Sequence, residues 1–559
     1  MDADRTHKLT LGGRPRRIAL LAITALLAAL AIPSAASATR GLITGFGDSE
    51  EYQQSSDSDR ALWMGRTADA GAGIVRLGVE WPAVASGAIK PADPTNPAST
   101  DYDFSSVDPA VREASAKGLK ILLSVNHAPT WAEGPNRPAS AAVGTWQPNP
   151  SDVADFMQAV ASRYSGSFNP GTGGTLPAVQ DIEVWDEPNS GDWLTPQFQG
   201  KTFTGAALYR DILNASYKAI KSVNPSIQVV VGGTDPYGDP PGGPYPASGG
   251  RERPVQFWEH VFCLREQKVK KKKKGKKAAP KLVRDPACTG KASFDVFAHH
   301  PIDNTGGGPL KSGPSRWDAS TPDLGRVVTV LRAAEKQGTA TGSGRHPVWV
   351  TEFWWDSKPP NPVGAPLATQ ARYIQQSMYL FWKAGASAAI NFQIVDSNLR
   401  PNVHAGFQAG VYFMDGRPKP SLTAFKFPFV TNRTTPTKLE AWGKAPESGK
   451  LLIQRQQGSR WLTVKKLQVS KGGVFDTTLR LRGKQRLRAS VGSSKSLVWK
   501  QAATGSKSSS GGGAGTTDIL LIAAGALLLI LVVAGVLRRR QVVRRRERRG
   551  PRIASAVTI

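Results

Sequence analysis

Short apolar runs alternate with amphipathic stretches along most of the chain, from Gly41 to about Val430. The apolar runs are continuous, which is typical of strands buried on both faces of a parallel sheet. Eight strand–helix units in series predict an α/β fold, a (β/α)8 TIM barrel. The predicted strands are GLITGF (41–46), GIVRLGVEW (73–81), LKILLSVNH (119–127), AVQDIEVW (178–185), IQVVVGG (227–233), SFDVFAHH (293–300), HPVWVTEF (346–353) and ASAAINFQIV (386–395).

The pattern changes after the predicted barrel, which we place at residues 39–430 with a lysine-rich inserted loop at 264–287. Residues 431–500 hold short runs with partial two-residue alternation and glycine-bearing turns, which is typical of antiparallel strands. We therefore predict a small all-β sandwich domain there. Residues 501–517, ending in SSSGGGAGTT, predict a flexible Gly/Ser linker.

Each end of the chain carries one more apolar run. Residues 1–38 combine three arginines, a short apolar stretch and a small-x-small cleavage pattern, which predicts a signal peptide; a retained N-terminal anchor is the alternative. Residues 518–537 are apolar and uncharged after Asp518, which predicts a transmembrane helix. The arginine-rich tail at 538–559 indicates a cytoplasmic C-terminus. The prediction is a single-pass cell-membrane protein with most of its chain outside the cell.

The net charge of +29 would suggest nucleic-acid binding if it were spread over the fold. Most of the excess lies in the leader, in the lysine run at 268–281, in residues 431–500 and in the tail, so the remainder is slightly acidic. We therefore expect no nucleic-acid partner. The lysine run is interpreted as a solvated loop. A sharper hypothesis is that it and residues 431–500 contact anionic cell-envelope polymers or phospholipid.

The only two cysteines, Cys263 and Cys288, bracket the lysine run. In an exported protein such a pair more often forms a disulfide than a metal site, so we predict a disulfide, with two free thiols as the alternative. The histidines form no metal-ligand pattern, and the pair at 299–300 is too local to be one. We expect no metal and no organic cofactor.

Acidic residues stand where two predicted strands end. The fourth apolar run stops at two adjacent carboxylates, Asp186 and Glu187, and Glu352 ends the seventh. In a barrel these strand ends open on one face, where active sites are built. A protonated acid beside an ionised one suits cleavage of a glycosidic bond. The alternative is that these are solvated acids of surface turns.

Five motifs in order give the chain a resemblance to clan A retaining glycoside hydrolases, especially family 39 and the cellulase-like family 5. The resemblance covers roughly residues 41–430. The motifs are VRLGVEW (75–81), NHAPTWA (126–132), WDEPN (185–189), AHHP (298–301) and WVTEF (349–353).

The resemblance implies roles for particular residues. Glu187 would be the general acid/base and Glu352 the nucleophile, with Arg76 supporting the nucleophile's carboxylate. His300, or else His299, would line the sugar site. Aromatic faces after strand ends would pack on sugar rings, although core packing is the alternative for each tryptophan. The remaining candidate substrate-binding residues are His127, Trp131, Asp186, Trp354 and Trp355.

The chain also departs from the family pattern. Asp186 stands where the clan usually has Asn, which donates a hydrogen bond, whereas an ionised Asp can only accept one. Ile302 replaces a frequent Tyr, and Asn391 or Phe392 lies near the position of a common platform Trp. We predict a retaining hydrolase acting on a carbohydrate. The alternatives are a cell-surface carbohydrate-binding or adhesion protein that has lost activity, and a scaffold that binds anionic polymers.

Overall fold

The structure is a computed structural model that describes residues 40–242, 250–268, 280–303, 306–397 and 407–503. The predicted signal peptide, nearly all of the predicted linker, the predicted span at 518–537, the basic tail and most of the lysine run lie outside these residues. Within the described residues, no helix combines the length and apolarity needed to cross a bilayer.

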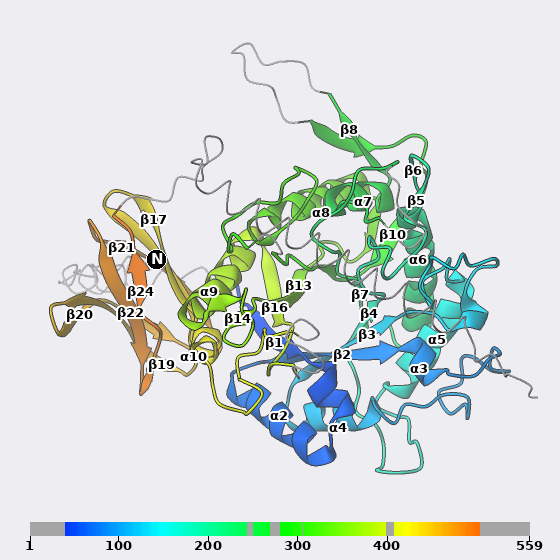
Figure 1. Cartoon of the computed structure of the whole chain (residues 1–559), viewed down its shortest axis with the longest axis horizontal. Coiled ribbons are helices and arrows are strands. Elements are labelled where there is room, and N and C mark those ends of the chain that lie inside the picture. The colour runs from blue at the N-terminus through cyan, green and yellow to red at the C-terminus, as the bar shows by residue number, and fades with distance from the viewer. Residues whose placement is uncertain (1–39, 243–249, 269–279, 304–305, 398–406, 504–559) are drawn as a thin grey trace, which may run out of the picture. The chain divides into compact units, whose positions relative to one another are not determined.

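Eight parallel strands form the central sheet, in the order β11–β13–β16–β1–β2–β3–β4–β7. Parallel bridges Val230–Val296 and Thr234–His299 join β7 to β11, so the sheet nearly closes into the predicted barrel (Figure 1). The strands are β1 (Ile43–Gly47), β2 (Ile74–Glu80), β3 (Lys120–Asn126), β4 (Asp181–Val184), β7 (Gln228–Val231), β11 (Phe297–His299), β13 (Val348–Phe353) and β16 (Ala386–Asn391).

Amphipathic helices follow the strands, as their sequence spacing predicts. In α6, for example, Tyr209, Ile212, Leu213 and Ile220 are buried because they recur every three or four residues and share one face. The helices are α2 (Asp57–Asp69), α3 (Trp81–Val84), α4 (Asp108–Ala116), α5 (Pro150–Arg163), α6 (Gly205–Val223), α7 (Pro254–Val261), α8 (Gly325–Gln337), α9 (Leu367–Ala384) and α10 (Pro420–Lys426).

All eight strands are shorter in the structure than in the sequence pattern, and for two of them the contacts show why. The run at 293–300 divides at Asp295, whose carboxylate accepts a hydrogen bond from the backbone N of Val229 at 2.8 Å and pairs with Lys221 at 2.6 Å. One half, β10 (Ala292–Phe294), pairs with β12 (Ala340–Gly342) outside the barrel. The predicted strand at 386–395 ends at Asn391, because the side-chain amide of Asn391 binds loop carbonyls of Gln393 and Ala409.

The cysteine prediction is confirmed: Cys263 and Cys288 form a disulfide, with their Cα atoms 5.3 Å apart. The described ends of the lysine-rich insertion form an antiparallel ribbon rather than an irregular loop. Its strands are β8 (Leu264–Gln267) and β9 (Lys281–Arg284). Two further pairs of short strands lie in loops. β5 (Phe198–Gln199) is antiparallel to β6 (Thr202–Phe203), and β14 (Ser357–Lys358) is parallel to β15 (Ala365–Pro366).

The C-terminal region is all-β, as predicted, and its two sheets are antiparallel. Leu451, Ile453, Leu479 and Leu487 are buried between them as part of the hydrophobic core. One sheet holds β17 (Phe429–Thr435), β18 (Lys438–Lys444) and β21 (Val474–Arg480). The other holds β19 (Gly449–Gln457), β20 (Arg460–Val469), β22 (Gln485–Val491), β23 (Ser494–Lys495) and β24 (Trp499–Gln501).

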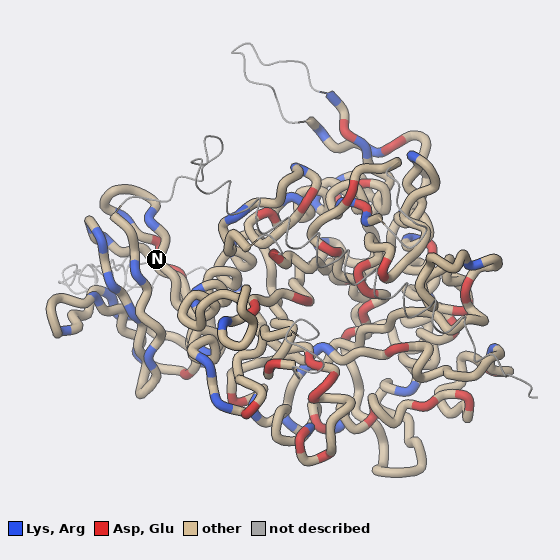
Figure 2. Tube along the Cα trace, in the orientation of Figure 1, with Lys and Arg blue, Asp and Glu red and all other residues tan. Residues whose placement is uncertain are grey.

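The charge distribution follows the division predicted from the sequence. Figure 2 shows Lys and Arg spaced along the strands of the all-β region and on the β8–β9 ribbon, while Asp and Glu gather around the middle of the barrel.

Candidate active site

A cavity of about 560 Å³ lies at the carboxyl ends of the barrel strands. Both predicted catalytic glutamates line it, which confirms that two acids 165 positions apart meet in one pocket. The lining residues come from loops and strand ends all round the barrel: Gly47, Ser49, Arg76, Gly78, Glu80, Ser124, Asn126, Asp186, Glu187, Trp193, Asp235, Arg251, Ile302, Thr351, Glu352, Trp354, Phe392 and Phe407.

Strand alternation explains why β2 and β3 supply polar residues to this cavity. The two strands pair over seven residues, from Ile74 opposite Lys120 to Glu80 opposite Asn126. Side chains two positions apart share a face of a strand, so Arg76, Gly78 and Glu80 face the barrel interior. The intervening apolar side chains face the surrounding helices.

The end of β4 places two neighbouring acids on the cavity by changing the backbone direction. Trp185 and Glu187 adopt positive φ angles, 72° and 34°, which are uncommon for residues other than glycine. Asp186 and Glu187 can therefore both line the cavity, which two successive residues of a regular strand cannot do. Such conformations are costly and concentrate at functional sites.

An irregularity in β13 has the same effect on Thr351 and Glu352. Between the pairs Val350–Ala389 and Phe353–Asn391 the strand advances three residues while β16 advances two. Bulges of this kind re-aim side chains. Both Thr351 and Glu352 consequently reach the cavity.

Arg76 is the centre of the acidic cluster. Its Nε donates to Glu183 Oε2 at 2.7 Å, and its Nη2 donates to Asp186 Oδ1 at 2.8 Å and to Ser124 Oγ at 2.9 Å. Its Nη1 lies 3.4 Å from Glu352 Oε2. The carboxylates more than offset the effect of burial and raise the pKa of Arg76, so the guanidinium stays charged. Asp186 is thus neutralised in part by a cation.

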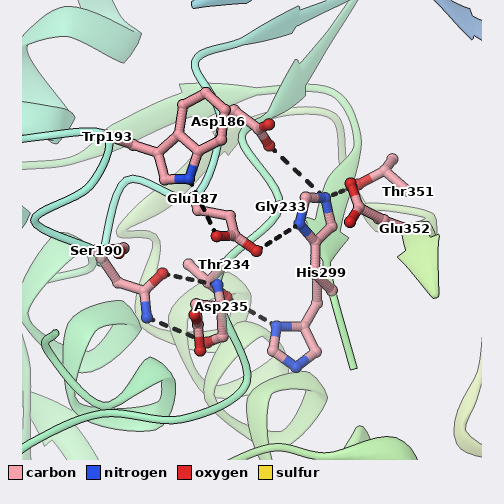
Figure 3. A network of polar contacts seen from close by, with 12 residues as sticks. Asp186, Glu187, Ser190, Trp193, Gly233, Thr234, Asp235, His299, Thr351 and Glu352 are labelled. Carbon is pink, nitrogen blue, oxygen red and sulfur yellow. Dashed lines mark hydrogen bonds and ion pairs between the residues drawn. The ribbon is translucent and has the colours of Figure 1, made fainter. Parts of the chain in front are cut away.

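Glu187 has no arginine or lysine at contact distance, and its carboxyl contacts His300 and Trp193. The indole N–H of Trp193 donates to Glu187 Oε2 at 3.2 Å (Figure 3). His300 Nδ1 lies 3.1 Å from Glu187 Oε1. Burial first, and then the charges of Asp235 and Asp186, raise the pKa of Glu187 well above its usual range. This shift favours the protonated form of Glu187 more than in an exposed carboxyl group.

Glu352 is in a different electrostatic environment. Burial, with the charges of Asp186 and Glu187, raises the pKa of Glu352, while His300 and Arg76 lower it, and the result is about 7. Of the two glutamates, Glu352 is the one that ionises near neutral pH, because cations oppose its burial.

The structure separates the two adjacent histidines. His300 contacts Glu187 and, through Nε2, Thr351 Oγ1 at 3.1 Å. His299 is completely buried on the other side of the strand, where Thr234 Oγ1 and the carbonyl of Ala319 hold its ring at 2.8 and 2.6 Å. Burial lowers the pKa of His299 to about 3. The prediction that His299 lines the site is therefore wrong, because a strand points successive side chains to opposite faces.

Two of the predicted sugar-stacking tryptophans do not line the cavity. Trp355 is 6% exposed, and its indole N–H donates to Ser377 Oγ at 3.1 Å behind the strand end. Trp131 packs edge-on against Trp81 at 5.4 Å. Both residues follow strand ends, as predicted, but their side chains pack between strands and helices.

Trp354 and His127 remain close to the site. Trp354 lines the cavity and packs edge-on against Phe407 at 5.2 Å; Phe407 in turn contacts Phe392 at 4.9 Å, so these rings form an aromatic wall. His127 stacks on the cavity residue Trp193 at 4.7 Å. His127 therefore orients a tryptophan that binds Glu187, rather than lining the cavity itself.

Sequence reasoning missed several polar residues of the site, among them Glu183, Ser124, Asp235 and Arg251. Glu183 is fully buried in β4. A charged residue inside an apolar run was the signal for it, since such a residue needs a buried partner. Arg251 lies 3.4 Å from both Asp235 and Asp192, and no short sequence pattern links these positions.

Asn189, the last residue of WDEPN, has a structural role. Its Oδ1 accepts from the backbone N of Asp235 at 2.8 Å, and its Nδ2 donates to the carbonyls of Asp235 and Glu252. It thereby fixes the loop that carries Asp235 beside the loop that carries Glu187. Among the described residues, no group of three or more His, Cys, Asp or Glu is arranged to hold a metal ion.

An eight-stranded parallel α/β barrel with a carboxylate-lined cavity at its carboxyl end is the class that the fold and the site define. No protein-family model and no curated protein matches the chain. Several solved glycoside hydrolases are similar to it in fold at low identity. A family 39 enzyme from Bacteroides cellulosilyticus WH2 is 17% identical, with a TM-score of 0.44, over 79% of this chain and 81% of that one.

Two other solved structures are similar at the same level. A GH30 endoxylanase from Clostridium papyrosolvens C71 is 13% identical, with a TM-score of 0.39, over 79% of this chain and 95% of that one. A GH5_18 protein from Streptomyces cattleya is 14% identical, with a TM-score of 0.41, over 69% of this chain and 79% of that one. The chemistry of the cavity has to be argued from its own residues.

Proposed function

We propose that the chain is a retaining glycoside hydrolase that cleaves O-glycosidic bonds of a poly- or oligosaccharide outside the cell. One observation carries the proposal: Glu187 and Glu352 line the same cavity in different electrostatic surroundings. Glycosidases need one carboxyl group that is protonated and a second that is ionised, on either side of the anomeric carbon. Burial of Glu187 favours its protonated form, and the Arg76 cation beside Glu352 favours the ionised form of Glu352.

The proposed reaction has two steps. In the first, Glu187 gives its proton to the glycosidic oxygen while the Glu352 carboxylate attacks the anomeric carbon, so that the C–O bond to the leaving group breaks and a glycosyl ester forms. In the second, water attacks the anomeric carbon, Glu187 takes its proton, and the ester to Glu352 breaks. His300 and Trp193 hold the Glu187 carboxyl, and Arg76 orients Glu352.

A fluorinated aryl glycoside tests this proposal, because a 2-fluoro substituent slows the second step and traps the ester. We expect the added sugar mass on Glu352, and we expect Glu352→Gln to abolish labelling. In Glu187→Gln, hydrolysis of substrates with poor leaving groups should fall by about 10³-fold or more, with activated aryl leaving groups less affected. Labelling at another residue, or inversion at the anomeric carbon, would contradict the mechanism.

The competing function is a carbohydrate-binding or adhesion protein without turnover. Asp186 favours it, because a third carboxylate competes with Glu352 for Arg76. Saturable glycan binding by a protein that neither releases product nor takes up the fluoro-sugar would support this alternative. A screen of aryl glycosides with wild type, Glu187→Gln and Glu352→Gln distinguishes the two functions.

The proposed location outside the cell, anchored by a C-terminal span, rests on the terminal segments of the sequence. The Cys263–Cys288 disulfide supports it, since structural disulfides persist in oxidising compartments. The measurement is protease accessibility in intact cells. The barrel should be digested from outside, while a tag at the C-terminus should stay protected.

Contact with anionic envelope polymers is supported by a second cavity, in the all-β region. It has a volume of about 550 Å³, and three cations but no carboxylate line it: Lys484, Arg486 and Lys500. We expect a triple change of these residues to Gln to lower the salt concentration that elutes the protein from heparin. Changing the exposed Lys450, Lys465 and Lys466 to Gln removes equal charge and is the control. Equal shifts would show that the cavity has no special role.

A further inference from the structure

More carboxyl groups than arginines line the candidate active site. Two arginines, Arg76 and Arg251, line the cavity, and both are already shared among carboxylates: Arg76 contacts three, and Arg251 contacts two. A neutral sugar would leave the excess of negative charge in place. The five carboxyl groups that line the cavity are those of Glu80, Asp186, Glu187, Asp235 and Glu352.

Asp186 lies beside both proposed catalytic glutamates. Its Oδ1 accepts from Arg76, which also contacts Glu352, and lies 3.9 Å from Nε2 of His300, which also contacts Glu187. No contact of its second oxygen, Oδ2, is found among the described residues, and the side chain is 9% exposed on the cavity. Because this oxygen is open to the cavity, it can accept a hydrogen bond from a donor on the ligand.

Sugar chemistry restricts where that donor can be. The proposed reaction holds the anomeric carbon between Glu187 and Glu352, and Asp186 lies next to both. One ring neighbour of the anomeric carbon is the ring oxygen, which has no hydrogen to donate. The other is carbon 2, so the substituent on carbon 2 is the donor that Asp186 faces.

We infer that the cleaved sugar carries a protonated amine on carbon 2, and that Asp186 selects this 2-amino-2-deoxy sugar over its 2-hydroxy and 2-acetamido counterparts. The inference rests on the proposed hydrolase function. An ammonium group offers Asp186 up to three donors and a positive charge, whereas a hydroxyl offers one donor and an acetamido group offers one donor without charge. The ammonium is also the only one of the three that offsets the excess of carboxylates.

The contact between Asp186 and the ammonium group would also assist the attack by Glu352. The groups that face Glu352 are Arg76 and His300, which favour its ionised form, and Asp186 and Glu187, which oppose it. A bound ammonium adds a cation to this balance and lowers the pKa of Glu352. The amine of the substrate would then help to ionise the nucleophile that attacks it.

The experiment compares three sets of aryl β-glycosides at about pH 6, where the amine is protonated. The sets carry 2-amino, 2-acetamido or 2-hydroxy substituents, each in the gluco and the galacto configuration. We expect kcat/KM of the wild type to be at least about tenfold higher for the amine, as a charge-assisted hydrogen bond predicts. Asp186→Asn should remove or reverse this preference. Glu80→Gln, which removes a charge from the same cavity, should retain it.

A wild type that prefers the 2-hydroxy or 2-acetamido substrate, or an Asp186→Asn variant with an unchanged preference, would overturn the inference. If fluoro-sugar labelling of Glu352 still succeeded, the hydrolase proposal would stand without it. If nothing were turned over or labelled, the hydrolase proposal would fail. Calorimetry would then compare the binding of 2-amino-2-deoxyglucose oligosaccharides with the binding of the fully acetylated oligosaccharides. Tighter binding of the amines supports the role of Asp186, and equal or weaker binding rejects it.

Discussion

Nη1 of Arg76 lies 3.4 Å from Oε2 of Glu352, whereas the same guanidinium contacts Glu183 at 2.7 Å. The arginine is thus bound more closely to a residue that does not line the cavity than to the proposed nucleophile. Its charge is also divided with Asp186. Burial raises the pKa of Glu352, and the shared guanidinium offsets only part of this effect, so the pKa is about 7.

The first prediction concerns Arg76. Glu352 has to be ionised to attack, so activity falls as the pH drops through its pKa. Arg76→Met removes a cation that lowers this pKa, so the acid limb of the kcat/KM profile should move to higher pH. Because Glu183 is fully buried, we also expect a loss of about 3–5 kcal/mol in the free energy of unfolding.

Arg76→Lys is the matched control for this change, since it keeps the charge but cannot reach every carboxylate at once. Its acid limb should stay closer to that of the wild type. An acid limb that does not move in Arg76→Met would contradict the role of Arg76 in setting the pKa of Glu352.

The second prediction concerns the stability cost of the nucleophile. The pKa of Glu352 is about 7 in the folded protein and 4.5 ordinarily, so the folded state binds this proton more tightly than the unfolded state. Its contribution to stability is therefore full below about pH 4.5 and is lost as the pH rises through about 7. Glu352→Gln cannot ionise, so it should be more stable than the wild type by about 2–3 kcal/mol near pH 8.

Urea denaturation at several pH values measures this difference. We expect the advantage of Glu352→Gln to shrink toward zero near pH 5, because the wild-type carboxyl is then protonated as well. An advantage that does not depend on pH would mean that ionisation of Glu352 does not cause it.

The eight strand–helix units of the barrel were predictable from the sequence, because a continuous apolar run indicates a strand buried on both faces. This holds whatever the order of the strands in the sheet. Glu187 and Glu352 were predictable for the same reason, since the carboxyl ends of parallel strands share one face. Asp295 was harder to anticipate. It stands inside an apolar run, and only its contacts with Val229 and Lys221 show that it divides the strand.

The orientation of side chains at strand ends was not predictable. His299 and His300 are both fully buried, but only His300 contacts Glu187, and of Trp354 and Trp355 only Trp354 lines the cavity. The deciding features are backbone irregularities, such as the positive φ of Glu187 and the register shift in β13. These irregularities depend on tertiary packing and cannot be predicted from residue type.

The third prediction concerns the acid. The indole N–H of Trp193 donates to Glu187 and favours its ionised form, so removing the donor should raise the pKa of Glu187 further. Glu187 has to be protonated to assist the leaving group. In Trp193→Phe the basic limb of the kcat/KM profile should therefore move to higher pH, while phenyl stacking on His127 is retained. A basic limb at lower pH would show that the indole instead stabilises the protonated acid.

The last prediction separates two adjacent tryptophans. Trp354 belongs to the aromatic wall of the cavity, so Trp354→Ala should raise KM by about tenfold with little change in kcat, through loss of packing on the sugar face. Trp355 is buried and bonded to Ser377, so Trp355→Phe should leave KM unchanged. It should instead lower the free energy of unfolding by about 1–3 kcal/mol. If Trp355→Phe alone raised KM, the sugar would have to lie on the other side of the strand end, and the cavity that Glu187 and Glu352 share would not be the binding site.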